Sequence, residues 1–220
     1  MRADVSQTTR PASKMIAPAT ILELAGVAVF AVSGALVATR LRQTFVTACF
    51  FALVTGVGGG SLRDLLLGVR AEWLEDRLVA VVILVSALAV WFTPGRWWRE
   101  RVLEWADAAG LAAFAALGTA KAVEYGVQPV PAIVLGVVSG CVGGIVRDVL
   151  AGVPSILMRP ELYVTAAALA ASISLIALEV GAPRFLALLL GTAAGFGLRG
   201  AAMIWRIELP SYAGSSRDPQ

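Results

Sequence analysis

GVGGGSLRDLLLGV, residues 56–69, returns as GCVGGIVRDVLAGV at residues 140–153, and these two stretches decide the fold of the chain. The second begins 84 residues after the first. At this offset residues 23–70 align with residues 107–154, with 18 identities in 48 positions. Chance identity in a chain of this composition is roughly one in ten. The chain is therefore built on an internal repeat, which constrains the architecture before any motif is interpreted.

The composition is that of a membrane protein. Of 220 residues, 58% are hydrophobic and 15% are charged, and the mean hydropathy is +0.80, which is too apolar for a soluble domain of this size. The net charge of +3 comes from arginine-rich connections between apolar segments, so no nucleic-acid partner is expected.

The residue types also argue against an enzyme. The sequence has no histidine and only two cysteines, Cys49 and Cys141, both within apolar runs. It therefore lacks the commonest metal ligand and general base, and no disulfide framework is expected. It also has no hydrolase serine motif and no carboxylate pair at a catalytic spacing. We expect no catalytic residue, no metal site and no cofactor.

Spanning the hydrocarbon core of a bilayer takes roughly 20 apolar residues in a helix. Seven segments qualify, and the fold class is therefore an all-α polytopic membrane protein. They lie at about 20–39, 45–67, 78–92, 106–122, 130–150, 162–178 and 185–205. The third is short and is expected to extend through Trp73-Leu74 or to be a thin packed helix. The predicted units are a polar tail at 1–19, repeats at 20–93 and 104–178, a seventh helix at 185–205 and a second tail at 206–220.

Three spans in each repeat is an odd number, so the second copy enters the membrane from the opposite face, as an inverted 3+3 repeat with one extra helix. Basic residues at the span ends indicate the orientation. The positive-inside rule places the C-terminus in the cytoplasm and the N-terminus outside, and we expect a bacterial inner membrane. One face holds Arg40, Arg42, Arg96, Arg99, Arg101, Arg159, Arg199, Arg206 and Arg217, and the other holds Arg2, Arg10, Lys14, Arg70, Arg77, Lys121 and Arg184.

Glycine clusters lie inside the second and fifth spans. They are Gly58, Gly59 and Gly60 in the first repeat and Gly140, Gly143 and Gly144 in the second. Each glycine costs a helix roughly 1 kcal/mol relative to alanine, so we expect both spans to be broken there and to line a polar cavity. The alternative is that these glycines are helix-packing faces. We favour the packing interpretation for Gly191 and Gly195 in the last span.

An Arg-Asp pair follows each cluster, as Arg63-Asp64 and Arg147-Asp148. Charges at membrane depth are costly and mark ion or substrate paths by default. Adjacent helical residues do not face each other, so the members of each pair are not expected to neutralise one another. Inversion sends the two pairs in opposite directions, which argues against cross-pairing and predicts two charged vestibules. The alternative is that the arginines cap half-helices or reach lipid headgroups.

Other polar residues in the spans have smaller expected roles. Glu23 aligns with Asp107 near the start of a span in each repeat, where the helix dipole favours a negative charge. The alternative is that both residues belong to an ion path. Lys121 is interpreted as an interfacial anchor. The hydroxyls that are candidates to contact a permeating ion, or else to make packing hydrogen bonds, belong to Ser33, Thr55, Ser61, Thr119 and Ser139.

With these motifs in place, the chain resembles prokaryotic members of the trimeric intracellular cation (TRIC) channel family. The resemblance covers about residues 22–205, and its specific part is the pair of glycine and Arg-Asp motifs. It implies a homotrimer in which each protomer has its own pathway, with potassium as the chief permeant ion and spans two and five lining the pore. Bacterial relatives also carry a domain label that names glycine transport.

Two functions follow. The first is a monovalent cation channel in which Asp64 and Asp148 concentrate cations while Arg63 and Arg147 tune or gate the flow. The alternative is a secondary transporter of a small zwitterion such as glycine, with the repeats rocking for alternating access. In either case membrane lipids surround the protein, and a phospholipid is a candidate ligand of the arginines.

Overall fold

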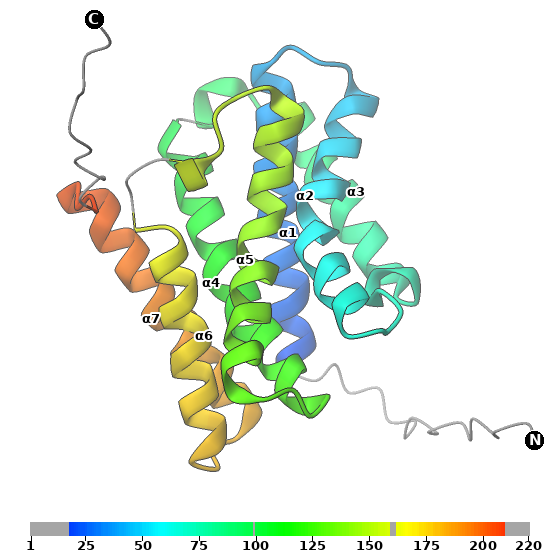
Figure 1. The fold of residues 1–220 in the computed structure, drawn as a ribbon. Helices are drawn as coiled ribbons and strands as arrows, with labels where there is room; N and C mark the ends of the chain where they lie inside the picture. The colour runs from blue at the N-terminus through cyan, green and yellow to red at the C-terminus, as the bar shows by residue number, and fades with distance from the viewer. Residues whose placement is uncertain (1–17, 99, 159–161, 210–220) are drawn as a thin grey trace, which may run out of the picture.

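A computed structural model describes residues 18–98, 100–158 and 162–209 of the chain. Over these residues it contains seven α-helices and three short 3-10 helices (Figure 1). The α-helices are α1 (Pro18–Arg40), α2 (Phe45–Leu66), α3 (Arg77–Phe92), α4 (Glu100–Glu124), α5 (Pro129–Ala151), α6 (Val164–Glu179) and α7 (Arg184–Trp205). The 3-10 helices are η1 (Glu72–Leu74), η2 (Gly95–Trp97) and η3 (Ile156–Met158). The predicted tails, apart from residues 18, 19 and 206–209, lie outside the described residues.

The all-α class is confirmed, and each predicted segment coincides with one α-helix. Five helices, α1, α2, α4, α5 and α7, are long and apolar enough to cross a membrane, whereas α3 and α6 are apolar but have only 16 residues each. The expected extension of the third segment through Trp73 is wrong. Trp73 lies in η1, which is a separate helix. Helix α3 begins after Asp76, whose side chain caps it by accepting a hydrogen bond from the Leu78 backbone N–H at 2.9 Å.

Successive helices run in alternate directions in Figure 1. As a result α1 and α4 run in opposite directions, as do α2 and α5. Helices α1 and α4 lie at the centre, α2 and α3 cover one side, and α6 and α7 cover the other. Helix α5 packs against α2, α4 and α6.

Helix α4 is the most enclosed element. Of its most apolar 18-residue window 83% is buried, against 39–50% for the other four long helices. Alanines make this possible, because their small side chains let the neighbouring helices approach α4 closely. Ala108, Ala112, Ala115 and Ala116 are all completely buried.

The glycine clusters do not break α2 or α5. Both helices are continuous through them, so the predicted breaks are wrong. The glycines instead sit where the two helices cross. A Cβ on Gly59 would lie under 3.0 Å from the Ser139 carbonyl oxygen, and a Cβ on Gly143 would lie 2.5 Å from that of Thr55. Close packing of one backbone on the other therefore offsets the helix-propensity cost of the glycines.

A second reciprocal contact joins α1 and α4. The rings of Phe30 and Phe114 stack with centroids 5.5 Å apart and planes inclined by 28°. Gly26 makes room for the Phe114 ring and Gly110 makes room for the Phe30 ring, since a Cβ at either position would lie under 3.0 Å from that ring. Both residue pairs are related by the offset of 84, as the α2–α5 contacts are.

Other glycines have conventional roles. Gly191 and Gly195 pack α7 onto α6, where a Cβ would meet the carbonyl oxygens of Ala170 and Ala166 at 2.5 and 2.8 Å, as predicted. Gly68 and Gly152 occupy equivalent places after α2 and α5 with φ of +70° and +67°, a conformation that favours glycine at a helix end.

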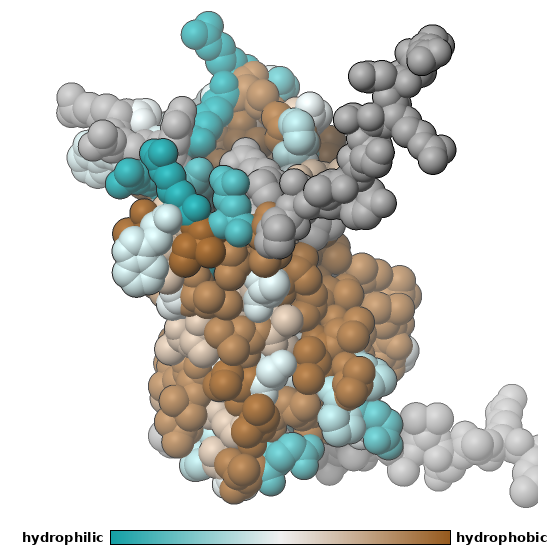
Figure 2. All heavy atoms as spheres, turned by 60° about the vertical axis from the view of Figure 1, so that its left-hand side comes forward, coloured by the Kyte–Doolittle hydropathy of each residue, from teal (hydrophilic) through white to brown (hydrophobic). Residues whose placement is uncertain are grey.

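The outer surface over α6 and α7 is mostly hydrophobic between hydrophilic ends (Figure 2). Exposed apolar side chains on this face include Ile176, Leu186, Leu189 and Leu190. A belt of this kind suits a lipid environment and would be unusual on a soluble monomer.

Candidate functional site

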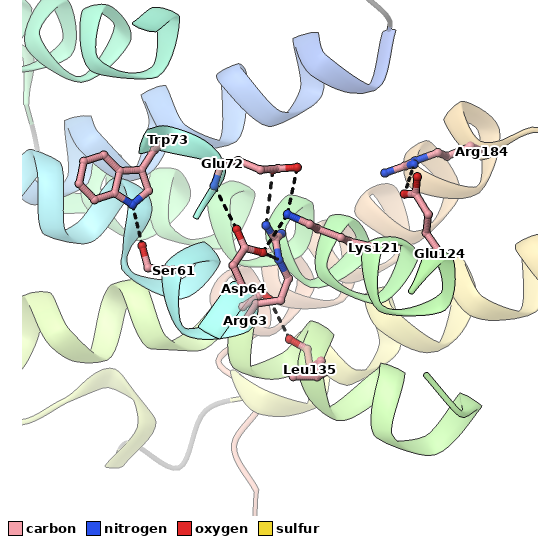
Figure 3. A network of polar contacts seen from close by, with 10 residues as sticks. Ser61, Arg63, Asp64, Glu72, Trp73, Lys121, Glu124, Leu135 and Arg184 are labelled. Carbon is pink, nitrogen blue, oxygen red and sulfur yellow. Dashed lines mark hydrogen bonds and ion pairs between the residues drawn. The ribbon is translucent and has the colours of Figure 1, made fainter. Parts of the chain in front are cut away.

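The first charged cluster joins the end of α2 to α4. The Arg63 Nε donates to Asp64 Oδ1 at 2.8 Å, and the Lys121 Nζ lies 2.8 Å from the same oxygen (Figure 3). Arg63, Asp64 and Lys121 are 3%, 1% and 6% exposed. Two cations therefore contact one buried carboxylate oxygen. Because the site is buried, the attraction between these cations and the carboxylate is stronger than it would be in water.

Glu72 in η1 closes this cluster from the loop side. Its carboxylate lies 3.0 Å from Lys121 Nζ and 3.5 Å from Arg63 Nη2, and its backbone N–H donates to Asp64 Oδ2 at 3.2 Å. Burial opposes ionisation of Glu72, but hydrogen bonds from Glu23 and Lys121 and the charges of Lys121 and Arg63 outweigh it and lower its pKa to about 2.

A narrow pocket opens beside this cluster. It is lined by Glu23, Val27, Gly56, Val57, Gly60, Arg63, Asp64, Glu72, Trp73, Val79 and Phe114. Its cavity volume of about 20 Å³ is enough for one water molecule. The Trp73 indole N–H donates to the Ser61 hydroxyl at 2.9 Å and ties η1 to α2 next to it (Figure 3).

The second charged cluster lies at the end of α5. The Arg147 Nε donates to Asp148 Oδ1 at 2.8 Å, and its Nη1 donates to Asp107 Oδ1 at 2.7 Å and to the Ser33 hydroxyl at 2.5 Å. The Ile156 backbone N–H donates to Asp148 Oδ2 at 2.9 Å. One guanidinium thus links α1, α4 and α5.

Two further residues enclose the second cluster. Tyr163, at the start of α6, is 1% exposed, and Arg199 on α7 is also 1% exposed. The Arg199 guanidinium carbon lies 5.5 Å from the centroid of the Tyr163 ring, within cation–π range. Arg199 therefore lies inside the bundle. Its assignment to the basic residues at the span ends, from which the orientation is predicted, is wrong.

The two clusters share one plan. Arg63, Asp64 and Glu23 correspond at the offset of 84 to Arg147, Asp148 and Asp107. The backbone N–H groups that bind the two aspartates, those of residues 72 and 156, are related by the same offset. The clusters differ in two additions, Lys121 in the first and Tyr163 in the second.

The structure bears on three predictions about the two Arg-Asp pairs. Each Arg-Asp pair does contact within itself, because the long arginine side chain folds back to its neighbour, so the expectation that they would not is wrong. No contact between Arg63 and Asp148, or between Arg147 and Asp64, exists among the described residues, as predicted. The pairs lie in buried ion-pair clusters and not in open vestibules: Arg147 and Asp148 are only 3% and 5% exposed.

The candidate hydroxyls make contacts within the protein. Thr119 donates to the Ala115 carbonyl oxygen at 3.0 Å and Ser139 donates to that of Leu135 at 2.8 Å. Ser33 and Ser61 accept from Arg147 and Trp73, and only the buried Thr55 hydroxyl has no hydrogen-bond partner. Of the candidate glycines, Gly60 lines the pocket, and Gly58 lies near the crossing without being confined by it.

Sequence reasoning missed several cluster members. Glu72 and Tyr163 were not singled out, and Lys121 was interpreted as an interfacial anchor, although it is buried between two carboxylates. Glu23 and Asp107 were interpreted as helix N-terminal charges, although each joins a cluster. The sequence does contain a sign that Lys121 is unusual. It aligns with Val37 in the first repeat, so it is a lone charge in an otherwise apolar segment.

These features define a class, the helical membrane proteins with charged clusters buried inside the bundle. Within it, the sequence profile of the family described as "Glycine transporter" matches the chain twice, over residues 20–94 and 104–179. The chain belongs to this family, which includes the TRIC proteins. It is 34% identical over 196 residues to the UPF0126 inner membrane protein YadS of Escherichia coli K12, covering 87% of this chain and 95% of that protein.

Further similarities support the assignment. A UPF0126 membrane protein of Vibrio cholerae is 36% identical over 199 residues, with 88% of this chain and 82% of that protein covered. The TRIC trimeric intracellular cation channel orthologue from Rhodobacter sphaeroides has a similar structure, with a TM-score of 0.79, 38% identity, and coverage of 86% and 98%. A second TRIC cation channel structure has a TM-score of 0.78 at 28% identity, with coverage of 89% and 98%. The chain is therefore an integral membrane protein.

Proposed function

We propose that this protein is a channel for monovalent cations, with potassium as the chief permeant ion. The observation that carries the proposal is the similarity to the cation channel orthologue from Rhodobacter sphaeroides, which extends over 86% of this chain at 38% identity. The two buried charged clusters fit this function, because charged groups inside a membrane bundle mark ion paths by default.

The pathway runs through a single protomer, past the α2–α5 crossing, with one charged cluster on each side of it. All seven helices belong to the membrane domain, and the two repeats have inverted topology. Reciprocal contacts support this arrangement, because Gly59 faces Ser139 as Gly143 faces Thr55. The opposite directions of α1 and α4 support it as well (Figure 1).

The protein assembles as a homotrimer in a bacterial inner membrane, with its N-terminus outside and its C-terminus in the cytoplasm. The Rhodobacter sphaeroides relative is a trimeric intracellular cation channel, which supports the trimer, and YadS is an inner membrane protein, which supports the inner membrane. A phospholipid headgroup would bind exposed arginines such as Arg42 and Arg206, because Arg63 and Arg147 are engaged with carboxylates.

The described conformation leaves little open space beside the first cluster. A pocket of about 20 Å³ is too small for a cation with its hydration shell. Asp64 attracts cations and Arg63 opposes them, so conduction requires the first cluster to rearrange. In the second cluster Asp148 attracts cations and Arg147 opposes them, so conduction requires this cluster to rearrange as well.

Planar-bilayer recording of the purified protein under a potassium chloride gradient tests the proposal. Unitary current steps that reverse near the potassium equilibrium potential are expected. Silent bilayers, together with accumulation of labelled glycine by proteoliposomes, would replace the channel with the zwitterion transporter. Protein-free membranes serve as the control for both measurements, and chemical cross-linking in the membrane tests the trimer.

A further inference from the structure

The 3-10 helices η1 and η3 occupy equivalent places in the two halves of the chain. Glu72, the first residue of η1, corresponds at the offset of 84 to Ile156, the first residue of η3. The backbone N–H of each donates to an aspartate, at 3.2 Å to Asp64 Oδ2 and at 2.9 Å to Asp148 Oδ2. The backbone thus holds both segments in the same way, and they differ in their side chains.

The side chains of η1 are held mainly by polar contacts (Figure 3). The Glu72 carboxylate lies 3.0 Å from Lys121 Nζ and 3.5 Å from Arg63 Nη2. The Trp73 indole N–H donates to the Ser61 hydroxyl at 2.9 Å. The Glu72 side chain is 42% exposed, and ion pairs of partly exposed groups contribute little to stability because water can replace each partner.

The side chain at the equivalent place in η3 is held by apolar packing. Ile156 is 6% exposed and belongs to a buried cluster that includes Leu111, Cys141 and Tyr163. Moving η3 away would expose this side chain to water, which is unfavourable in proportion to the apolar area exposed. Of the two segments, η1 is therefore the easier to displace.

Helix η1 forms one wall of the pocket beside the first charged cluster. Glu72 and Trp73 line this pocket together with residues of α1, α2, α3 and α4. With η1 in place the cavity volume is about 20 Å³, which is room for one water molecule. The other walls belong to α-helices of at least 16 residues, whereas η1 has three residues. It is the wall that can move without moving a long helix.

We propose that η1 is a lid over this pocket, and that the pocket opens to the aqueous phase when the side-chain contacts of Glu72 and Trp73 are exchanged for contacts with water. The equivalent segment η3 stays in place, so access is controlled at one end of the bundle. This inference deepens the proposed cation channel by naming the segment that controls access to its first charged cluster, and it rests on that channel for this role.

The repeat supplies a matched pair of positions for testing the lid. Val57 lines the pocket beside η1, and at the offset of 84 it corresponds to Cys141, which lies in the same buried cluster as Ile156 of η3. Val57 and Cys141 are 8% and 4% exposed, so neither is open to a reagent in the described conformation.

Two full-length proteins with a single cysteine are compared in detergent. One carries Val57→Cys together with Cys49→Ala and Cys141→Ala, and the other carries Cys49→Ala alone and keeps Cys141. The rate of reaction with N-ethylmaleimide is measured for each folded protein and divided by the rate for the same protein unfolded in denaturant. This ratio reports how often each position becomes accessible.

The lid predicts unequal rates. Position 57 should react about tenfold faster than Cys141, because η1 moves without exposing a buried isoleucine. Glu72→Gln should raise the rate at position 57 about fivefold, since two partly exposed ion pairs are lost, and should leave the rate at Cys141 unchanged. Trp73→Phe, which removes the hydrogen bond to Ser61, should act in the same direction and keeps the test informative if Glu72→Gln does not fold.

Matched controls make the same changes away from the pocket. Glu124→Gln removes an exposed ion pair with Arg184, and Trp97→Phe replaces an exposed tryptophan of η2. Neither residue is among those that line the pocket, so both variants should leave the rate at position 57 unchanged. Equal rates at position 57 and Cys141, or a rate at position 57 that responds to neither lid variant, would overturn the lid. A parallel rise at both positions would show general loosening of the bundle and would also overturn it.

The labelling rates do not depend on ion flux, so the lid and the channel can fail separately. If the protein conducts potassium while position 57 stays as unreactive as Cys141 in every variant, the channel is retained and the lid is lost. If position 57 responds to Glu72→Gln but bilayers stay silent, the lid is retained and its role in a channel is lost.

Discussion

Adjacent glycines in α2 provide a sharp test of how the two halves pack. Gly59→Ala places a Cβ under 3.0 Å from the Ser139 carbonyl oxygen and 3.0 Å from its carbonyl carbon. These are backbone atoms held within α5, so they cannot rotate away. At Gly58 the nearest atom to an added Cβ is the Gly143 Cα at 3.9 Å, an ordinary contact. The two substitutions are chemically identical and one residue apart.

The expected difference follows from this geometry. Both alanines gain about 1 kcal/mol of helix propensity. Overpacking of a closely packed site costs about 1–3 kcal/mol, and only Gly59→Ala incurs it, at the upper end because backbone must move. In a protein of this length 1 kcal/mol corresponds to roughly 2–4 °C in Tm. Gly58→Ala should therefore unfold roughly 6–12 °C above Gly59→Ala by the same conversion.

Thermal unfolding of the detergent-purified variants, followed by size-exclusion chromatography, measures this difference. Gly143→Ala should behave like Gly59→Ala, because its Cβ would lie 2.5 Å from the Thr55 carbonyl oxygen. If Gly58→Ala is as damaging as Gly59→Ala, the glycines are needed for helix flexibility and the packing explanation fails. If Gly59→Ala is as stable as the wild type, the α2–α5 crossing is looser than described.

Substitutions at three further residues address the first charged cluster. Lys121→Met should lower the free energy of unfolding by about 3 kcal/mol, since it removes one of the two cations that contact the buried Asp64 carboxylate. Lys121→Arg should recover part of this in denaturant titrations, and equal losses would rule out an ion-pair role. Asp64→Asn should change conductance similarly at low and high salt, because buried charges are screened little; an effect confined to low salt would place Asp64 at an open mouth. Glu72 has a pKa lowered to about 2, so its contribution to stability is complete above its ordinary pKa near 4.5 and disappears as the pH falls through about 2. Wild type should therefore lose Tm relative to Glu72→Gln between these values, and parallel pH profiles would contradict the ion pairs of Glu72.

The positions of the helices could be predicted because they depend on local properties. Each segment is a long apolar run that ends at polar residues, and the same pattern recurs in both repeats. The error at the glycine clusters has a physical origin. Helix propensity describes an isolated helix. At Gly59 and Gly143 the propensity cost is offset by close packing against a partner helix, and the local sequence does not identify that partner.

The clusters could be predicted only in part. Arg63 and Asp64 were identified because they repeat as Arg147 and Asp148. Lys121 and Tyr163 have no charged or aromatic counterpart at the same offset, and their partners come from helices distant in the sequence. Only the three-dimensional arrangement shows that each of them faces a carboxylate-bearing cluster.

The reciprocal glycine contacts have a consequence for the origin and the divisibility of the chain. A surface on which residue i meets residue j while j meets i is the signature of two identical subunits related by a two-fold axis. In this protein one chain supplies both sides, through Gly59 with Ser139 and Gly143 with Thr55. Each half therefore carries a surface complementary to the other half. Co-expressed fragments divided between α3 and α4 should reassemble, as a fused dimer would after its linker is cut.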